Sequence, residues 1–300
     1  MAKVLTFGSL NVDHVYTVEH FVRPGETISA KKLELFCGGK GLNQSIALAR
    51  AGAEVYHAGA VGAQDGDALL ATLERAGVHT ELIQKLQTES GHAIIQVDAN
   101  GQNSILIYGG ANRMICREWV EDVLSRFSEG DFLVLQNEIN CVRELIELAH
   151  ARKMKIACNP SPIDESVQQL PLEDCDYLIV NEVEGQALCP DAAAGELLSR
   201  LHTKFPHSAI LLTLGADGAR YLAPGMNEPI KQAAYRLPVK DTTAAGDTFM
   251  GCFIAKISNG HTASEALQFA SAAAGIAVSR DGAEASITTY AEVEAMLREK

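Results

Sequence analysis

The amino-acid sequence predicts an α/β fold built on a large, mostly parallel sheet. Short apolar runs without polar alternation recur along the chain, which is typical of strands buried on both faces of such a sheet. Between them lie stretches with apolar residues at three- and four-residue spacing, several of which stop at a glycine such as Gly52 or Gly77. Strands that alternate with helices in this way indicate repeated β-α-β units.

The predicted strands and helices follow one another in order. Strands are expected at residues 4–7, 55–60, 132–136, 155–159, 177–181 and 209–213. Helices are expected at residues 42–51, 67–76, 117–127, 143–152, 192–205 and 245–258. Thr262 with Glu265, and Thr289 with Glu292, have the spacing of capping boxes, so two further helices are expected close to the C-terminus.

Two segments depart from this alternation. Residues 12–36 and 91–108 carry alternating polar and apolar side chains, interrupted by turn signals at Pro24-Gly25 and Asn100-Gly101. We interpret them as a small accessory sheet beside the large one. Because no repeat, low-complexity stretch or linker marks a second unit, residues 1–300 are expected to form a single domain.

The composition excludes several classes of protein. The chain has 300 residues, of which 47% are hydrophobic and 21% charged, so it can bury a large core and is not wholly disordered. Its 38 acidic and 25 basic residues give a formal net charge of −13, which repels nucleic acids and anionic membranes. We therefore expect small-molecule partners, with no nucleic acid and no membrane.

The cysteines and the first residues indicate a cellular compartment. The seven cysteines are scattered, without any Cys-x-x-Cys pair, which disfavours a disulfide framework and a structural zinc site. The apolar stretch at residues 4–10 is followed at once by Asn11 and Asp13, so it is predicted to be a first strand and not an export signal. A cytoplasmic protein is expected.

A glycine-rich motif, Gly38-Gly39-Lys40-Gly41-Leu42-Asn43-Gln44, opens the first predicted helix. Consecutive glycines allow a ligand to touch the backbone, and the helix start offers free N–H groups to an oxygen-rich ligand. The motif is not a P-loop, because Glu34 and Gly41 occupy positions that require glycine and a hydroxyl residue. A plain tight turn before a helix is the structural alternative. The sequence also lacks Gly-x-Gly-x-x-Gly, which argues against an NAD-dependent dehydrogenase.

A second motif, Asp241-Thr242-Thr243-Ala244-Ala245-Gly246-Asp247-Thr248, opens another predicted helix. The small residues at 244–246 allow close approach, and their N–H groups can stabilise negative charge on a phosphoryl group in transfer. Asp247 is placed to act as a general base on an alcohol. The alternative is that Asp247 is an ordinary acidic residue in the first turn of a helix.

Polar and small residues also follow several predicted strands. Ligands bind at the carboxyl ends of parallel strands in open α/β sheets, which makes this shared position informative. Each residue taken alone could equally be a helix cap or a turn residue. The residues are Asn11, Asp13, Glu138, Asn181, Glu184, Thr213, Gly215 and Gly218.

The two glycine-rich motifs, in this order and about two hundred residues apart, resemble the ribokinase-like (PfkB-type) family of carbohydrate kinases. Other segments that resemble the family's motifs occur in the family's order over the whole chain: 8–13, 24–27, 159–162, 181–184 and 213–215. The resemblance implies a three-layer αβα sandwich with a mostly parallel central sheet and a small β-sheet lid. Residues 12–36 and 91–108 would supply the lid strands, through which a homodimer is expected.

The resemblance also implies transfer of the γ-phosphate of ATP to the primary hydroxyl of a pentose, with D-ribose as the expected sugar. The sugar would be held by Asn11, Asp13, Gly39, Lys40, Asn43, Glu138 and Asp247. Asp247 would be the catalytic base, beside an anion hole formed by Ala244, Ala245 and Gly246. ATP would contact Asn181, Glu184, Thr213, Gly215, Gly218, Gly246 and Ser271, with Mg²⁺ near Glu184. A K⁺ ion would be bound by Asp241, Thr243, Ala277, Arg280, Gly282 and Ser286, mainly through carbonyl oxygens.

Other functions stay open at this point. Leu42 and Asn137 depart from the family's usual residues and His92 lies in a lid segment, so deoxyribose, a ketohexose or a nucleoside could be the acceptor. A non-catalytic sugar or nucleotide sensor would keep the fold without the reaction. The bare Ala-Ala-Gly-Asp run argues against a sensor, because a sensor needs no anion hole beside a carboxylate.

Overall fold

The structure, a computed structural model, describes residues 2–193 and 195–299. The strands of its large sheet are β1 (Val4–Phe7), β4 (Val55–Gly62), β5 (His79–Leu86), β8 (Phe132–Gln136), β9 (Lys155–Asn159), β10 (Tyr177–Asn181), β11 (Ala209–Thr213), β12 (Ala219–Leu222) and β13 (Ile230–Gln232). The helices are α1 (Lys40–Arg50), α2 (Asp67–Arg75), α3 (Arg117–Leu124), α4 (Val142–Ala151), α5 (Glu182–Leu188), α6 (Leu197–Lys204), α7 (Ala245–Ser258), α8 (Ala263–Ala277) and α9 (Tyr290–Arg298).

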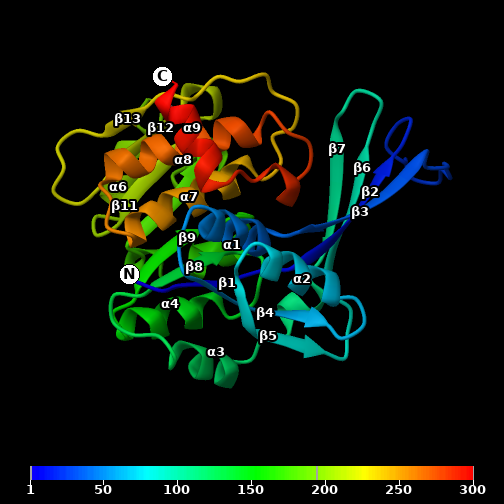
Figure 1. Cartoon of the computed structure of the whole chain (residues 1–300), viewed down its shortest axis with the longest axis horizontal. Helices are drawn as coiled ribbons and strands as arrows, with labels where there is room; N and C mark the ends of the chain where they lie inside the picture. Colours follow the sequence, from blue (N-terminus) through cyan, green and yellow to red (C-terminus); the bar gives the residue numbers. More distant parts are fainter. Residues whose placement is uncertain (1, 194, 300) are drawn as a thin grey trace.

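Within the described residues the large sheet has nine strands, in the order β13-β12-β11-β10-β9-β8-β1-β4-β5 (Figure 1). From β11 to β5 all neighbours are parallel, and β12 and β13 add an antiparallel edge. The predicted α/β class with a mostly parallel sheet is therefore confirmed. Among the described residues, no helix is long and apolar enough to cross a lipid bilayer.

Successive side chains of the central strands enter two different cores. Val4 packs with α1, α2, α7, α8 and α9 on one face of the sheet, whereas Leu5 and Phe7 pack with α3, α4, α5 and α6 on the other. Phe132 and Leu133 in β8 divide in the same way. Side chains alternate between the faces of a strand, so an unbroken apolar run fills both cores and produces the αβα sandwich.

Most predicted elements lie where the sequence placed them. β1, β8, β9, β10 and β11 have the predicted limits, and the capping boxes at Thr262 and Thr289 begin α8 and α9. The helix predicted at 192–205 is too long, because α6 begins only at Leu197. The Gln186 amide donates to the carbonyls of Pro190 and Ala192 and thereby holds the residues before α6 in a turn. Residue 194 of that predicted helix lies outside the described residues.

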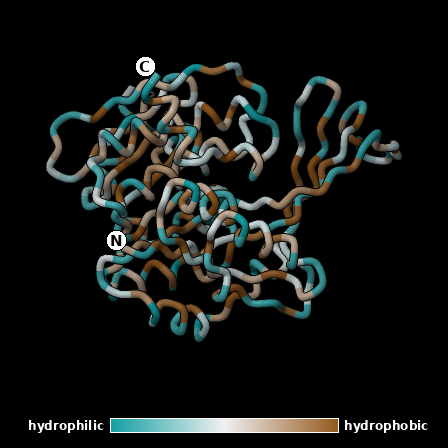
Figure 2. The backbone as a smooth tube through the Cα atoms, viewed as in Figure 1, coloured by the Kyte–Doolittle hydropathy of each residue, from teal (hydrophilic) through white to brown (hydrophobic). Residues whose placement is uncertain are grey.

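The accessory segments form a separate four-stranded sheet in the order β3-β2-β6-β7. Its strands are β2 (Asn11–Thr17), β3 (Lys32–Gly38), β6 (Gly91–Val97) and β7 (Asn103–Tyr108). We call this sheet the lid sheet. Figure 1 shows it projecting from one side of the body, and Figure 2 shows hydrophobic stretches along its strands.

Candidate active site

The two glycine-rich motifs meet at the carboxyl end of β1. Gly39, which precedes α1, has φ +95, and a Cβ there would lie 3.1 Å from the Ser9 carbonyl oxygen. A Cβ at Gly41 would lie 2.4 Å from the Ser9 nitrogen. Glycine at both positions therefore lets α1 begin directly against the backbone that follows β1, and helix α7 packs along α1 through Gly251.

Asp247 lies in the first turn of α7 and faces the start of α1. Its side chain is buried, with a residue exposure of 9%. The Asn43 amide donates to Asp247 Oδ2 over 3.1 Å, and the Gln44 amide donates to Asp247 Oδ1 over 2.9 Å. Because a carboxylate has further lone pairs, these two bonds orient Asp247 and still leave it able to accept a proton.

The start of α7 offers backbone donors beside this carboxylate. Ala244 is the residue before the helix and has φ +59, a left-handed conformation that is strained for alanine. The Ala245 N–H points to the Thr242 carbonyl at 3.3 Å, but no acceptor among the described residues takes the N–H of Gly246 or Asp247. A Cβ at Gly246 would contact nothing. The bare space and the free donors fit an anion at this helix start.

The Asp247, Glu138 and Glu184 carboxylates all act on the Lys40 ammonium, and Asp13 lies close to Glu138. The Glu138 carboxylate accepts from the Lys40 N–H over 3.0 Å and from the Ser9 hydroxyl. Burial raises the pKa of Asp13 to about 7, and the charge of Glu138 adds to that rise. Burial also disfavours the Lys40 ammonium, but the Asp247, Glu138 and Glu184 carboxylates outweigh it and hold the pKa of Lys40 above its ordinary value. Lys40 thus stays charged among carboxylates that can accept hydrogen bonds from hydroxyl groups.

Asn112 is a residue that the sequence reasoning missed. Its amide nitrogen donates to Asn11 Oδ1 over 2.8 Å, and its amide oxygen accepts from the Leu10 N–H over 3.0 Å. In sequence, Asn112 lies more than a hundred residues from Asn11. It belongs to a short 3-10 turn, and no motif marks it. Asn43 Oδ1 is buried and has no hydrogen-bond partner among the described residues, as suits an acceptor for a ligand hydroxyl.

Asn181 and Glu184 follow β10 and form a capping box at the start of α5. The Glu184 N–H donates to the Asn181 side chain over 2.8 Å, while Glu184 Oε2 accepts from the Asn181 N–H and from the Asn159 amide. The helix-cap alternative therefore describes what these side chains do within the chain. Glu184 Oε1 accepts no hydrogen bond from the described residues, so one carboxylate oxygen is left for a ligand.

The other residues assigned to ATP lie farther along the sheet and on α8. Thr213 ends β11, and Gly215 and Gly218 follow with positive φ. A Cβ at Gly218 would lie 2.0 Å from the Gln232 carbonyl oxygen, so this glycine is required by the turn itself. The buried Ser271 hydroxyl has no partner among the described residues.

The segments predicted to bind a cation are brought side by side. Asp241 accepts from the Thr243 N–H over 2.8 Å and from the Gly282 N–H over 3.0 Å. Although burial favours the neutral acid, these donors hold the pKa of Asp241 below its ordinary value. The Ser286 hydroxyl donates to the Ala283 carbonyl over 2.7 Å, and the Ala277 carbonyl accepts from the Arg280 N–H over 3.0 Å.

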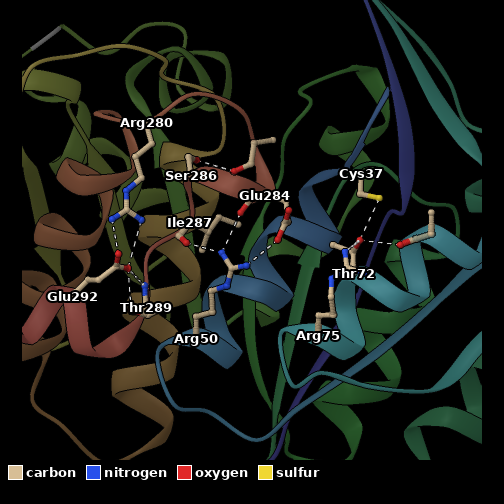
Figure 3. A network of polar contacts seen from close by, with 12 residues as sticks. Cys37, Arg50, Thr72, Arg75, Arg280, Glu284, Ser286, Ile287, Thr289 and Glu292 are labelled. Carbon is tan, nitrogen blue, oxygen red and sulfur yellow. Dashed lines mark hydrogen bonds and ion pairs between the residues drawn. The ribbon is translucent and has the colours of Figure 1, made fainter. Parts of the chain in front are cut away.

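Figure 3 shows what fixes the loop that carries Gly282 and Ser286. The Arg50 guanidinium donates to the Ile287 carbonyl over 2.6 Å and to the Glu284 carboxylate over 2.8 Å. The Arg280 side chain pairs with Glu292 over 2.6 Å and, with other donors, lowers the pKa of Glu292 to about 2. Only the backbone of Arg280 is thus available to a cation.

The three residues suspected of altering the sugar pocket point elsewhere. Leu42 is fully buried in the core between the sheet and α7. The Asn137 amide donates to the Pro162 carbonyl over 2.8 Å. His92 pairs with Val12 across the lid sheet, whereas Asp13 is the next residue along, so His92 lies on the face opposite to Asp13.

Comparisons with known proteins give one consistent family. The model of the pfkB family of carbohydrate kinases matches residues 1–290. A ribokinase of Bacillus subtilis is 35% identical over 301 residues, covering 99% of this chain and 100% of the relative. A deoxyribokinase of Salmonella typhi is 30% identical over 263 residues, 83% of this chain and 84% of the relative.

Solved structures give the same picture. The ribokinase of Cryptococcus neoformans in complex with ADP has a TM-score of 0.85 and 34% identity, over 99% of this chain and all of that one. The ribokinase of Arabidopsis thaliana complexed with ribose and ATP has a TM-score of 0.87 and 27% identity, over 99% of both chains.

Proposed function

The chain belongs to the pfkB family of carbohydrate kinases, and we propose that it transfers the γ-phosphate of ATP to the primary hydroxyl of D-ribose, giving ribose 5-phosphate. It is an ATP-dependent carbohydrate kinase. The observation that carries the proposal is the juxtaposition of the buried Asp247 carboxylate with the free N–H groups at the start of α7. A base for an alcohol and donors for a phosphoryl group then lie within one helix turn.

In the proposed reaction, Asn11, Asp13, Asn43 and Glu138 hold the sugar hydroxyls and Lys40 balances the local negative charge. Asp247 accepts the proton of the primary hydroxyl as its oxygen forms a bond to the γ-phosphorus. The bond between that phosphorus and the β,γ-bridging oxygen breaks, and ADP leaves. The Gly246 and Asp247 N–H groups stabilise charge on the transferring phosphoryl group, which is where most catalysis of phosphoryl transfer arises.

Mg²⁺ and K⁺ are proposed as the ions of this site. The described residues contain no group of three or more His, Cys, Asp or Glu side chains that could bind a metal by themselves. Mg²⁺ bound to ATP needs only one or two carboxylates, which fits the free Glu184 oxygen; when bound, it would neutralise phosphate charge. The carbonyl-rich loop held by Asp241 and Arg50 suits a monovalent cation.

We further propose a cytoplasmic homodimer joined through the lid sheet. The cytoplasm is supported by the odd number of scattered cysteines in the sequence. The dimer is supported by apolar side chains that are more than half exposed on the lid, namely Leu33, Leu35, Ile105, Leu106, Ile107 and Tyr108.

Deoxyribose is the second candidate acceptor, because the chain is also 30% identical to a deoxyribokinase. Asp13 separates the two, since a carboxylate set to accept from a vicinal diol loses a donor when one hydroxyl is missing. ADP release should be measured with ribose, 2-deoxyribose, fructose and a nucleoside, in K⁺ and in Na⁺. We expect ribose to exceed 2-deoxyribose in kcat/KM by at least about 10-fold, with faster turnover in K⁺.

The Asp13→Asn variant is the control, and the ratio between the two sugars should narrow in it. If the protein preferred 2-deoxyribose, the proposed acceptor would be 2-deoxyribose in place of ribose. If none of these compounds supported ATP turnover, the alternative of a non-catalytic sensor would be restored.

A further inference from the structure

A row of buried amides leads from Asp247 to side chains that are not assigned to the substrates. Gln44 in α1 and Gln136 at the end of β8 are each only 1% exposed. The Gln44 amide nitrogen donates to Asp247 Oδ1 over 2.9 Å. Gln44 Oε1 in turn accepts from the Gln136 amide nitrogen over 2.7 Å. The three side chains join β8, α1 and α7 from positions 92 and 203 residues apart in sequence.

The Asp247 charge determines the direction of both amides. An ionised carboxylate can only accept, so Gln44 must present its NH₂ group to Asp247 and its oxygen to Gln136. Gln136 must then present its own NH₂ group to Gln44. Its oxygen is left facing Gly8, where a Cβ would lie 2.4 Å from it, and it has no hydrogen-bond partner among the described residues.

That unpaired oxygen is informative about function. A buried acceptor without a partner costs free energy, and apolar residues of similar size at both positions 44 and 136 would avoid the cost. The pair of amides therefore leaves one acceptor, Gln136 Oε1, unpaired, while the Gln44 NH₂ group stays directed at Asp247. Lys40 is a charged neighbour of Asp247, the Glu138 and Glu184 carboxylates act on the same ammonium, and Asn43 is the other amide donor to Asp247.

We propose that Gln136, acting through Gln44, is a positioning residue that orients the Asp247 carboxylate toward the sugar hydroxyl. This inference rests on the proposed function, because it assigns Asp247 the role of base. Gln136 is buried and is not among the residues assigned to the substrates, so its effect should fall on kcat and not on the KM for ribose. A residue needed only for packing would not move the pH dependence of the reaction.

The decisive variant is Gln136→Glu, which changes one NH₂ group to oxygen. Where it is ionised, a Glu at position 136 can only accept, so Gln44 would turn round and direct its oxygen at Asp247. Where burial keeps this Glu protonated, it still donates to Gln44, and the Gln136→Met variant carries the test. We expect the acidic limb of the kcat–pH profile to move upward by about one pH unit or more, and kcat at pH 7 to fall about 10-fold or more. The KM for ribose should change less than about 3-fold.

Two further variants make the result interpretable. Gln136→Met keeps the volume and removes the donor, so kcat should fall with an unchanged KM even if a buried Glu prevents folding. Gln169→Glu adds the same charge at an exposed position, and its kcat–pH profile should match that of the unsubstituted protein. Unchanged kcat and an unchanged pH profile in folded Gln136→Met would overturn the proposal. An unsubstituted protein that phosphorylates no sugar would instead overturn the proposed function.

Discussion

The Asp13 carboxyl lies on β2 of the lid sheet and is half-buried, and burial and the Glu138 charge raise its pKa to about 7. Ionisation removes the acid proton, so that both oxygens can accept from two sugar hydroxyls. We therefore expect kcat/KM for ribose to rise about 10-fold between pH 6 and pH 8 and to level off above, following the ionised fraction of Asp13. The Asp13→Asn variant should be less active and show no such rise. A flat profile in the unsubstituted protein would contradict this assignment.

The same shift makes a prediction about stability. The pKa of Asp13 is raised in the folded state, so between about pH 4 and pH 7 the folded protein binds more protons than the unfolded chain. Stability contributed by Asp13 must then fall as the pH rises through this window. Asp13→Asn should melt at a higher temperature than the unsubstituted protein at pH 8, with a difference that shrinks toward pH 5. Calorimetry without ligands measures it, and an equal gap at both pH values would refute it.

At the residue scale, the sequence could predict a side chain only where a motif marks it. Asp247 and Asn43 stand in glycine-rich motifs before helices, and the structure brings their side chains together. Gln136 and Asn112 stand in no motif, and their partners lie about a hundred residues away. Such contacts depend on how elements that are distant in sequence pack together, which residue spacing does not encode.

The contact between α1 and α7 determines where Asp247 lies relative to Gln44. A Cβ at Gly251 in α7 would lie 2.5 Å from the Ala47 Cβ and 2.8 Å from the Gln44 carbonyl oxygen. Alanine normally favours a helix over glycine, but here we expect Gly251→Ala to lower the free energy of unfolding by about 1–3 kcal/mol. The displaced helix should also lower kcat. Chemical denaturation and steady-state kinetics measure both effects.

Gly246→Ala in the same helix is the matched control. Its Cβ would contact nothing within the described residues, so stability should be unchanged or slightly increased. Activity should still fall, because the new methyl group would occupy the space proposed for the phosphoryl group. Equal stabilities of the two variants would show that the α1–α7 contact is looser than described.

At the scale of elements, the buried parallel strands were predictable and the edges were not. Apolar runs mark β1 and β8 to β11, because both faces of those strands are covered. β5, β12 and β13 were missed, since the edge strand β5 carries polar side chains, and β12 and the edge strand β13 have only four and three residues. α5 was missed as well, because its seven residues give too little periodicity beyond the Asn181 cap.

At the scale of the whole molecule, most of the exposed large apolar side chains among the described residues lie on the lid sheet. Phe36, Asp13, Ala93 and Ile107 form one row across its four strands. Leu106, which is 66% exposed, belongs to the next row and so points to the opposite face. Apolar side chains thus lie on both faces, including the one that carries Asp13.

We expect sedimentation velocity at micromolar concentration to show a dimer. Leu106→Glu and Ile107→Glu each place a charge on one face of β7, so one of the two should dissociate the dimer and thereby identify the contacting face. Ile107→Glu should in addition raise the KM for ribose, because it shares a face with Asp13. A monomeric unsubstituted protein, or two dimeric variants, would rule out assembly through the lid.

The most direct test of the account is turnover by the Asp247→Asn variant with ribose and ATP. Asparagine keeps the size, and Asn43 can turn its unpaired oxygen to the new NH₂ group, but asparagine cannot accept a proton, so kcat should fall at least about 100-fold. ATP affinity and the melting temperature should stay close to those of the unsubstituted protein. Turnover within a few-fold of the unsubstituted protein would contradict the assignment of Asp247 as the base.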